Sequence, residues 1–551
     1  MKGWPYKWQV VASVVFGTFM VIMDATVVNV ALPTLRTVFA GSGGGDIGQV
    51  QWVISGFVLA IGIVTPMAGL LADRFGIKKV YLLSLFGFAA ASALCGLAPN
   101  LFALILFRIV QGLAGGSALP LGTALLFNAF PPEERGLAFG VFGIPLVVAP
   151  AVGPVLGGAL VEYASWRFIF FINVPIGLLG VGIGWWLLRE SKQEGRVAID
   201  YVGAILAFLA FGGILYGLSN GAPSGFSAPG QAAAPSGWST WQVQLSLGLG
   251  ALALVAFFVW EYVKKEDALL DVRLFKRPTF MIANVIGWIS VIGFFGAEFL
   301  LPLYLQILRG LTPLQTGLLL LPLAISSGIL SPFIGRLQDK IGPRLLVAAG
   351  FGLLIVNTWQ FSLLSLNESY GYIALLLVLR GVALALVLQP TLLAALSGIS
   401  ARALPRASSL VNASRSIFQS LGVALLATIL ATTTADQLST FQPPKPSSFP
   451  LPPNYQQTVQ QAITDAFHQA FLAGLSNAYF LTFAVAAAAF VIALFLPGWP
   501  FRWKPPADEP EVGQRAATSA FDAPGASEEP LEGAVDDVGG GEDSVPAPLG
   551  H

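Results

Sequence analysis

Long apolar stretches separated by short polar segments run through most of the sequence. A helix that crosses a bilayer needs roughly 20 mainly apolar residues, and fourteen stretches meet that requirement. They cover approximately residues 10–33, 50–71, 79–98, 101–128, 136–160, 168–188, 201–219, 241–262, 279–308, 313–335, 344–365, 371–396, 407–431 and 472–496. The pattern predicts an all-α polytopic membrane protein with fourteen transmembrane helices.

The basic residues between these stretches predict the orientation, because loops that face the cytoplasm are enriched in Lys and Arg. With a cytoplasmic N-terminus, 22 of the 29 Lys and Arg residues fall inside and four fall outside. The other three, Arg108, Arg380 and Arg415, fall within spans. A missing or extra span would reverse this bias, so the sequence favours an even number of spans with both termini in the cytoplasm.

Composition excludes a soluble enzyme. Only 11% of the residues are charged, against roughly 25% in soluble domains. The formal net charge of zero is a cancellation, since residues 1–500 carry +8 and residues 501–551 carry −8. The acidic tail is rich in Pro, Gly and Ala, which predicts disorder. We expect no nucleic-acid partner, because the basic residues follow membrane topology.

Reactive side chains are scarce. Cys95 is the single cysteine, and His468 and His551 are the two histidines, so an intramolecular disulfide and a Cys/His metal cluster are excluded. A phosphate-binding P-loop motif is absent from the sequence, which disfavours an ATP-driven pump. An intramembrane enzyme would need embedded histidines, clustered acids or a metal motif. We therefore expect neither an enzyme nor a cofactor.

An internal repeat divides the chain. In residues 69–78 and again in residues 335–344, Gly, Asp, a base, Gly and a base recur in the same order, 266 residues apart. Arg108 has a weaker counterpart in Arg380. Parallel repeats of this kind are typical of transporters whose halves move around a central site. The predicted parts are residues 1–190 and 279–500, each a six-helix bundle, residues 191–278 with two inserted helices, and the tail 501–551.

Five segments identify a family. Residues 69–79 resemble the loop motif of the major facilitator superfamily, and residues 108–112 resemble its fourth-helix motif. Residues 143–158 resemble the fifth-helix motif of its antiporters. Residues 23–33 and 165–177 are similar to the 14-helix drug:proton antiporters of the EmrB/QacA type.

The resemblance covers residues 10–500 and implies the major facilitator fold, with two pseudo-symmetric six-helix bundles plus two inserted helices. It implies a bacterial cytoplasmic (inner) membrane protein that exports hydrophobic, often cationic compounds in exchange for H+. The proton gradient drives transport without a cofactor, and the partners are the substrate, H+ and membrane lipid. The protein would act with a periplasmic adaptor or otherwise as a monomer. An exporter or flippase of an endogenous lipid or metabolite is the alternative. The charged residues within the spans argue against a membrane scaffold that does not transport.

Asp24 and Glu298 are the carboxylates that lie well inside the predicted spans. Burial penalises the charged form of a carboxyl group, and an embedded charge costs roughly 2.5–3.5 kcal/mol on insertion scales. Competition between a proton and a cationic drug for one carboxylate would yield antiport. The resemblance assigns proton coupling to Arg108 as well. The alternative for all three residues is a structural ion pair or hydrogen bond between helices.

The resemblance also places the first helix of each half beside a central cavity. We therefore expect that cavity to be lined by Asp24, Asn29, Gln111, Glu298 and Gln306.

The repeated loop is a candidate gate, made of Gly69, Asp73, Arg74, Gly76, Lys78 and Asp339. The glycines permit tight turns, and Asp73 is placed to pair with a base or a helix N-terminus of the other half. The resemblance implies a cytoplasmic latch that stabilises the outward-open state. Topology and turn chemistry alone are the alternative explanation.

The antiporter motif contains Gly143, Pro150, Gly153, Pro154, Gly157 and Gly158. Gly153 and Gly157 are four residues apart, which lets helix backbones approach closely, and prolines bend a helix. A gating helix beside the cavity is predicted, with ordinary helix packing as the alternative.

Overall fold

The computed structural model describes residues 5–39, 47–190, 200–221, 237–264, 269–401, 403–442 and 455–498. Within these residues there is no strand, and fourteen helices are long and apolar enough to cross a membrane. The predicted number and order of spans are confirmed. The predicted acidic tail lies outside the described residues, and the domain boundaries stay predictions.

The spans of the first half are formed by α1 to α9. They are α1 (Tyr6–Phe39), α2 (Ile47–Val64) continued by α3 (Ala68–Phe75), α4 (Ile77–Gly96), α5 (Leu101–Gly115) continued by α6 (Ala118–Ala129), α7 (Arg135–Tyr163), and α8 (Phe168–Phe171) continued by α9 (Asn173–Leu187).

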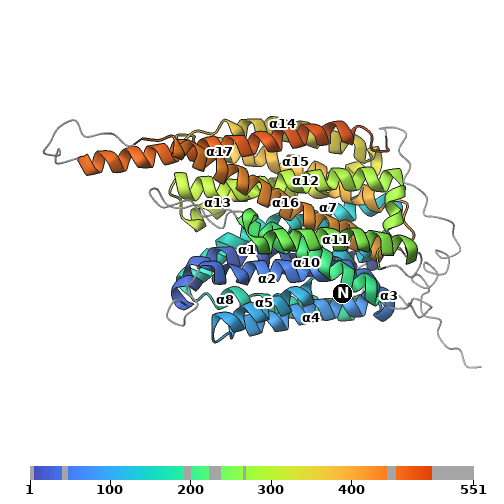
Figure 1. The fold of residues 1–551 in the computed structure, drawn as a ribbon. Helices are drawn as coiled ribbons and strands as arrows, with labels where there is room; N and C mark the ends of the chain where they lie inside the picture. The colour runs from blue at the N-terminus through green and yellow to red at the C-terminus, as the bar shows by residue number, and fades with distance from the viewer. Residues whose placement is uncertain are drawn as a thin grey trace, which may run out of the picture. The chain divides into compact units, whose positions relative to one another are not determined.

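The two inserted helices are α10 (Tyr201–Gly221) and α11 (Trp241–Lys264). The second half contains α12 (Pro278–Leu303) with a π-helical end (Tyr304–Leu308), α13 (Pro313–Ile341), α14 (Pro343–Ser362), α15 (Tyr370–Leu396), α16 (Leu404–Ser439) and α17 (Tyr455–Ala493). Figure 1 shows these helices running side by side, with α3 near the right and the start of α17 at the left.

Local sequence explains where several helices begin and end. Gly76 and Gly342 occupy equivalent places in the repeat, and both have positive φ (91° and 81°) at the turn between two helices. Glycine adopts this conformation without the penalty that a Cβ brings. Asn100 caps α5 through its side chain, and Thr312 caps α13 in a reciprocal pair with Gln315. The repeat in the sequence is thus also a repeat in backbone geometry.

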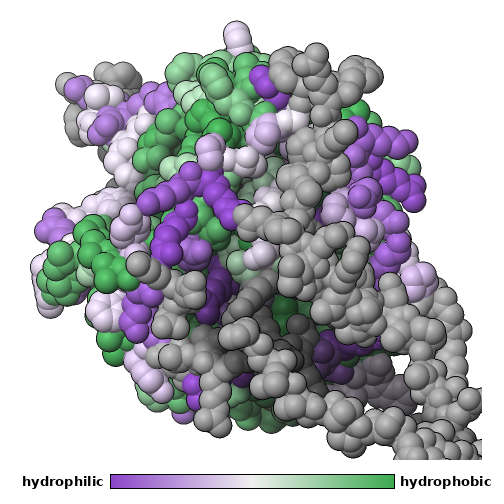
Figure 2. Space-filling view, turned by 90° about the vertical axis from the view of Figure 1, so that its right-hand side faces the viewer, coloured by the Kyte–Doolittle hydropathy of each residue, from purple (hydrophilic) through white to green (hydrophobic). Residues whose placement is uncertain are grey.

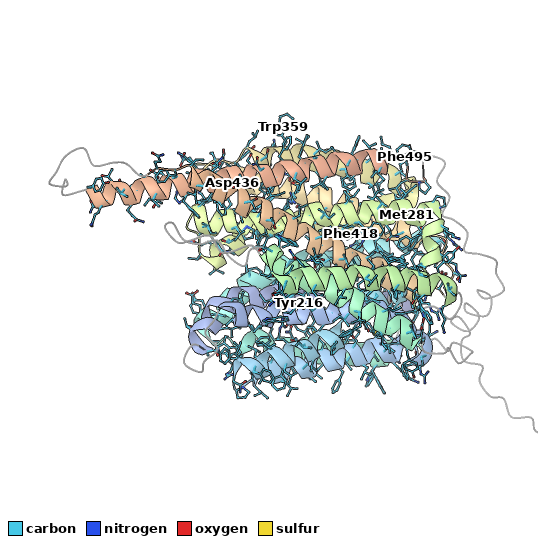
Figure 3. All side chains as sticks on the ribbon, in the orientation of Figure 1. Tyr216, Met281, Trp359, Phe418, Asp436 and Phe495 are labelled. Carbon is cyan, nitrogen blue, oxygen red and sulfur yellow. The ribbon has the colours of Figure 1, made fainter. Side chains whose placement is uncertain are left out.

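The outer surface carries large apolar side chains. Trp359 and Phe495 are 57% and 70% exposed, and Figure 3 shows them pointing away from the helices. Hydrophobic residues left at the surface in this number indicate a surrounding lipid phase. We call the end of the helices that carries the two repeated loops the motif end. Figure 2 views this end, where hydrophilic residues gather beside hydrophobic ones.

Three groups of helices join the two halves. α7 packs along α13 and contacts α15, while the start of α16 packs against α3 and α6. The inserted α10 contacts both α2 and α16, and Figure 1 shows it beside α2. Ser55 of α2 and Ser219 of α10 are hydrogen-bonded through their hydroxyls at 3.3 Å. Trp238, just before α11, donates to Thr428 of α16 at 2.9 Å.

Candidate functional site

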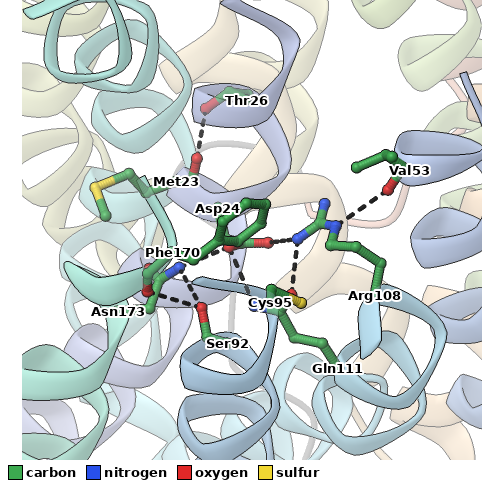
Figure 4. Close-up of polar contacts among 10 residues, drawn as sticks. All are labelled: Met23, Asp24, Thr26, Val53, Ser92, Cys95, Arg108, Gln111, Phe170 and Asn173. Carbon is green, nitrogen blue, oxygen red and sulfur yellow. Dashed lines mark hydrogen bonds and ion pairs between the residues drawn. The ribbon is translucent and has the colours of Figure 1, made fainter. Parts of the chain in front are cut away.

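A closed polar cluster surrounds Asp24 at the centre of the first half (Figure 4). Arg108 Nη1 donates to Asp24 Oδ2 at 2.5 Å and to Gln111 Oε1 at 2.8 Å. Gln111 Nε2 in turn donates to Asp24 Oδ1 at 3.1 Å. The cluster therefore joins α1 to α5 through an ion pair and one amide hydrogen bond, and the Arg108–Gln111 bond within α5 links the two donors.

Arg108 is held from two further sides. Its Nε donates to the Val53 carbonyl at 3.1 Å, and its Cζ lies 4.0 Å from the centroid of the Phe57 ring. Arg108 and Asp24 are both fully buried, yet Arg108 Nη2 has no hydrogen-bond partner. An unpaired buried donor is costly, so the cluster has the capacity to take one more acceptor.

Asn173 and Ser92 complete the cluster, and neither is among the predicted site residues. Asn173 Nδ2 donates to Asp24 Oδ1 at 2.6 Å and to Ser92 Oγ at 3.1 Å. Asn173 stands at the start of the apolar helix α9. A polar side chain in such a run is a signal that could have identified it.

A cavity of about 820 Å³ lies between the halves, in the part of the molecule away from the motif end. Apolar side chains form most of its lining, and the charged residues in that lining are Glu298 and Arg380. Gln306, Gln419 and several hydroxyls add polar points. Its lining also includes Leu215, Leu218 and Ser219 of the inserted helix α10.

The predicted cavity residues separate into two groups. Glu298 and Gln306 line the cavity. Asp24 and Gln111 do not, because both side chains turn into the first half and are fully buried there. The side chain of Asn29 lies outside the described residues. Competition between a proton and a drug at Asp24 therefore has no direct path in this state.

Arg380 approaches Asn357 Oδ1 at 3.5 Å, and its guanidinium lies 5.8 Å from the Phe361 ring. It also interacts electrostatically with Glu298. Glu298 thus faces the cavity rather than a closed set of hydrogen-bond donors.

Asp73 forms the contact between the halves at the motif end. Its Oδ2 accepts from Arg406 Nε at 2.5 Å, 333 positions away in the sequence. Gly69 packs on the same residue, since a Cβ at this position would lie 2.8 Å from Arg406 Cα. The first loop therefore pairs with a base, one of the two predicted partners.

Asp339 pairs with a helix N-terminus, the other kind of partner that was predicted for Asp73. Its Oδ1 accepts from Gly136 N at 2.7 Å and its Oδ2 from Leu137 N at 3.1 Å. These amides begin α7, where unpaired N–H groups and the helix dipole favour a carboxylate. Ser408 of α16 adds a third link by donating to the Pro120 carbonyl at 2.8 Å. The motif end is closed by contacts from both repeats.

The remaining gate residues stay within the first half. Arg74 is exposed and lies over the Phe75 ring at 5.6 Å. Lys78 Nζ donates to the Trp185 carbonyl at 3.0 Å. Gly76 provides the positive-φ turn described above.

The antiporter motif lies on α7, between the Asp24 cluster and the cavity. A Cβ at Gly157 would lie 2.9 Å from the Val27 carbonyl of α1, and one at Gly153 would meet Thr26. A Cβ at Gly143 would instead lie 2.9 Å from Gln389 Cγ of α15. Pro150 and Pro154 line the cavity, whereas Gly158 is partly exposed. The glycines bring α7 against both halves.

Metal ions are bound in proteins by groups of particular side chains. Among the described residues there is no group of three or more His, Cys, Asp or Glu side chains that could hold a metal ion. The expectation that no cofactor is needed stays a prediction.

Comparisons with known proteins agree with this architecture. Residues 14–423 match the family model described as Major Facilitator Superfamily. The chain is 34% identical to the multidrug export protein EmrB of Escherichia coli, over 75% of this chain and 78% of EmrB. It is also 34% identical to the fatty acid resistance protein FarB of Neisseria gonorrhoeae, over 78% of this chain and 82% of FarB.

A solved structure shows the same fold. The human organic anion transporter MFSD10 superposes with a TM-score of 0.58 at 16% identity, over 88% of this chain and all of that one. With a family model over most of the chain and relatives above 30% identity, the protein belongs to the major facilitator superfamily and is a multi-pass membrane transporter.

Proposed function

We propose that the protein is a proton-coupled exporter of hydrophobic, cationic compounds in a bacterial inner membrane. The observation that carries the proposal is the sealed Asp24–Arg108 pair beside a separate, mainly apolar cavity with its own carboxylate. The names of the related proteins support export of hydrophobic compounds. We place the motif end and both termini in the cytoplasm, following the distribution of basic residues.

In this proposal Asp24 carries the proton. Protonation would remove the negative charge that pairs with Arg108, whose own charge persists at any physiological pH. The guanidinium would then seek another acceptor, and its unpaired Nη2 is already placed to take one. The resulting rearrangement of α1 against α5 would reach α7 through Gly153 and Gly157.

Glu298 receives the cationic group of the substrate. The apolar lining takes the hydrophobic body, and burial of apolar surface stabilises the complex by about 25 cal/mol per Å². Proton and substrate occupy different carboxylates, so coupling passes through the change of conformation rather than through one shared site.

The closed motif end makes this the outward-facing arrangement. Exchange to the inward-facing arrangement must break the Asp73–Arg406 pair and release Asp339 from the start of α7. Each contact is a charge-assisted hydrogen bond, the stronger kind. They hold the two halves together until protonation or substrate binding favours the other arrangement.

The name of FarB, which records fatty acid resistance, supports a second candidate: export of an endogenous amphipathic acid. The two candidates share one transport cycle and differ in the charge of the substrate.

Reconstituted protein tests the proposal. Ethidium uptake into proteoliposomes with an imposed proton gradient should be strong for the unaltered protein and lost in Asp24→Asn. Counterflow, the exchange of labelled for unlabelled ethidium without a gradient, should persist in Asp24→Asn, which shows that the variant is folded. Asp436→Asn is the matched control, since Asp436 is exposed on the outer part of α16 (Figure 3). Gradient-driven uptake by Asp24→Asn would refute the assignment of the proton to Asp24.

A further inference from the structure

The three arginines embedded in the spans differ in their partners. Arg108 is paired with Asp24, and Arg380 interacts with Glu298 and Asn357. Arg415 of α16 has no hydrogen bond or ion pair with any residue that the structure describes, and its Nε is buried without a partner. An ionisable residue inside a membrane protein that lacks a counter-ion indicates a functional site.

Arg415 lies in a slot between α16 and α12. The slot exists because residue 287 is glycine, since a Cβ there would lie 3.1 Å from both Nε and Nη2 of Arg415. Beside it, Trp288 and Phe418 stack with ring centroids 4.7 Å apart, and Trp288 Nε1 donates to Ser414 Oγ at 2.9 Å. The aromatic pair fixes the two helices next to the guanidinium.

Polar neighbours on the same helix do not satisfy Arg415. Asn412 Nδ2 donates to the Ser408 carbonyl at 2.8 Å, and Gln419, one turn further along α16, lines the cavity. Because one helical turn rises about 5.4 Å, Arg415 lies directly below the cavity, on the side of the motif end. Opening of the motif end would extend the cavity to it.

We propose that Arg415 binds the carboxylate of an amphipathic acid, such as a medium-chain fatty acid, while the alkyl chain lies in the cavity. The inference rests on the proposed export function and assigns a binding residue to the acidic substrate that was its second candidate. A guanidinium matches a carboxylate with two parallel hydrogen bonds, and it repels the cations that Glu298 attracts. One pathway thus carries a cation site and an anion site at different depths.

Binding can be measured without transport. Trp288 is next to the slot, so 2-bromodecanoate, whose bromine is adjacent to the carboxylate, should quench its fluorescence in the purified full-length protein. Trp288→Phe should remove that part of the quenching. Arg415→Gln should weaken binding of the acid about tenfold or more, because charged hydrogen bonds are the stronger kind. Arg415→Lys should restore part of the affinity. The methyl ester of the same compound should bind the unaltered protein and Arg415→Gln equally.

Cells lacking their own exporters provide the second readout. Arg415→Gln should lower resistance to decanoate while resistance to ethidium stays near that of the unaltered protein. Equal loss for the acid and the ester, or equal loss for decanoate and ethidium, would mean a structural role and overturn the proposal, as would unchanged binding of the acid. Failure of the unaltered protein to export either compound would instead refute the exporter function.

Discussion

Each half of the molecule has a carboxylate on its first helix and an arginine on its fourth, but the two pairs have different surroundings. Asp24 and Arg108 are closed in by Gln111 and Asn173, with both charges fully buried. Glu298 and Arg380 both line the cavity. The same arrangement in a repeat is a sealed ion pair in one half, whereas in the other half the two charges lie along the cavity wall.

This difference indicates how the proton and the drug, which need different surroundings, bind at separate places. A proton needs only a carboxylate and a path for one small ion. In a site without water, the charge that protonation removes interacts more strongly with its neighbours. A drug needs volume and apolar surface, which the cavity between the halves supplies. The predictions below test whether the pairs differ in this way, from the largest expected effect to the smallest.

Asp24→Asn should destabilise the purified protein by about 3–5 kcal/mol, since it leaves the buried charge of Arg108 without its counter-ion. Glu298→Gln should change stability by less than about 1 kcal/mol, because Glu298 faces the cavity and forms no ion pair with the described residues. Thermal unfolding in one detergent measures both. Equal effects of the two variants would contradict the difference between the pairs.

Asp73→Asn should weaken closure of the motif end by about 1.5–3 kcal/mol, the contribution of a hydrogen bond to a charged group. Arg74→Ala is the matched control, because Arg74 is exposed and contacts only its own half. The reporter is Ser408→Cys in a Cys95→Ser background, since Ser408 is buried at the closed contact. Labelling of residue 408 should be at least about tenfold faster with Asp73→Asn. The same rate with Arg74→Ala would show that general loss of charge, not the pair, opens this end.

Gly157→Ala should cost about 1–3 kcal/mol, because the new methyl group meets the backbone of α1 behind the Asp24 cluster. Gly158→Ala, at the adjacent and partly exposed position, should have little effect. Proton-driven ethidium transport and thermal stability should fall together in the first variant. Normal transport in Gly157→Ala would mean that contact between α7 and α1 does not matter for the sealed pair.

Much of the fold could be predicted from the sequence because the signals are local. Lipid excludes backbone groups without internal hydrogen bonds, so the length of an apolar stretch predicts a helix. The repeated loops predicted two related halves, and the turns at Gly76 and Gly342 confirm that relation in the backbone.

The pairings could not be predicted, because they depend on how each helix is rotated against its neighbours. Helical spacing placed Gln111 on the same face as Arg108 but did not say that this face turns away from the cavity. Arg406 was one basic residue among many in the loops, and nothing in its neighbourhood marked it as the partner of Asp73. Asn173 lay in a segment that carried the family resemblance without a predicted role.

The inserted helix α10 touches α2 in one half and α16 in the other, and it forms part of the cavity wall. Rotation of the halves must therefore shift or break the contact of α10 with α2 or its contact with α16. The first contact includes the Ser55–Ser219 hydrogen bond, and the Trp238–Thr428 hydrogen bond adjoins the second. That work is repeated in every cycle and is independent of the compound carried. The added pair of helices thus contributes to the activation barrier of the exchange and to the turnover rate of the transporter.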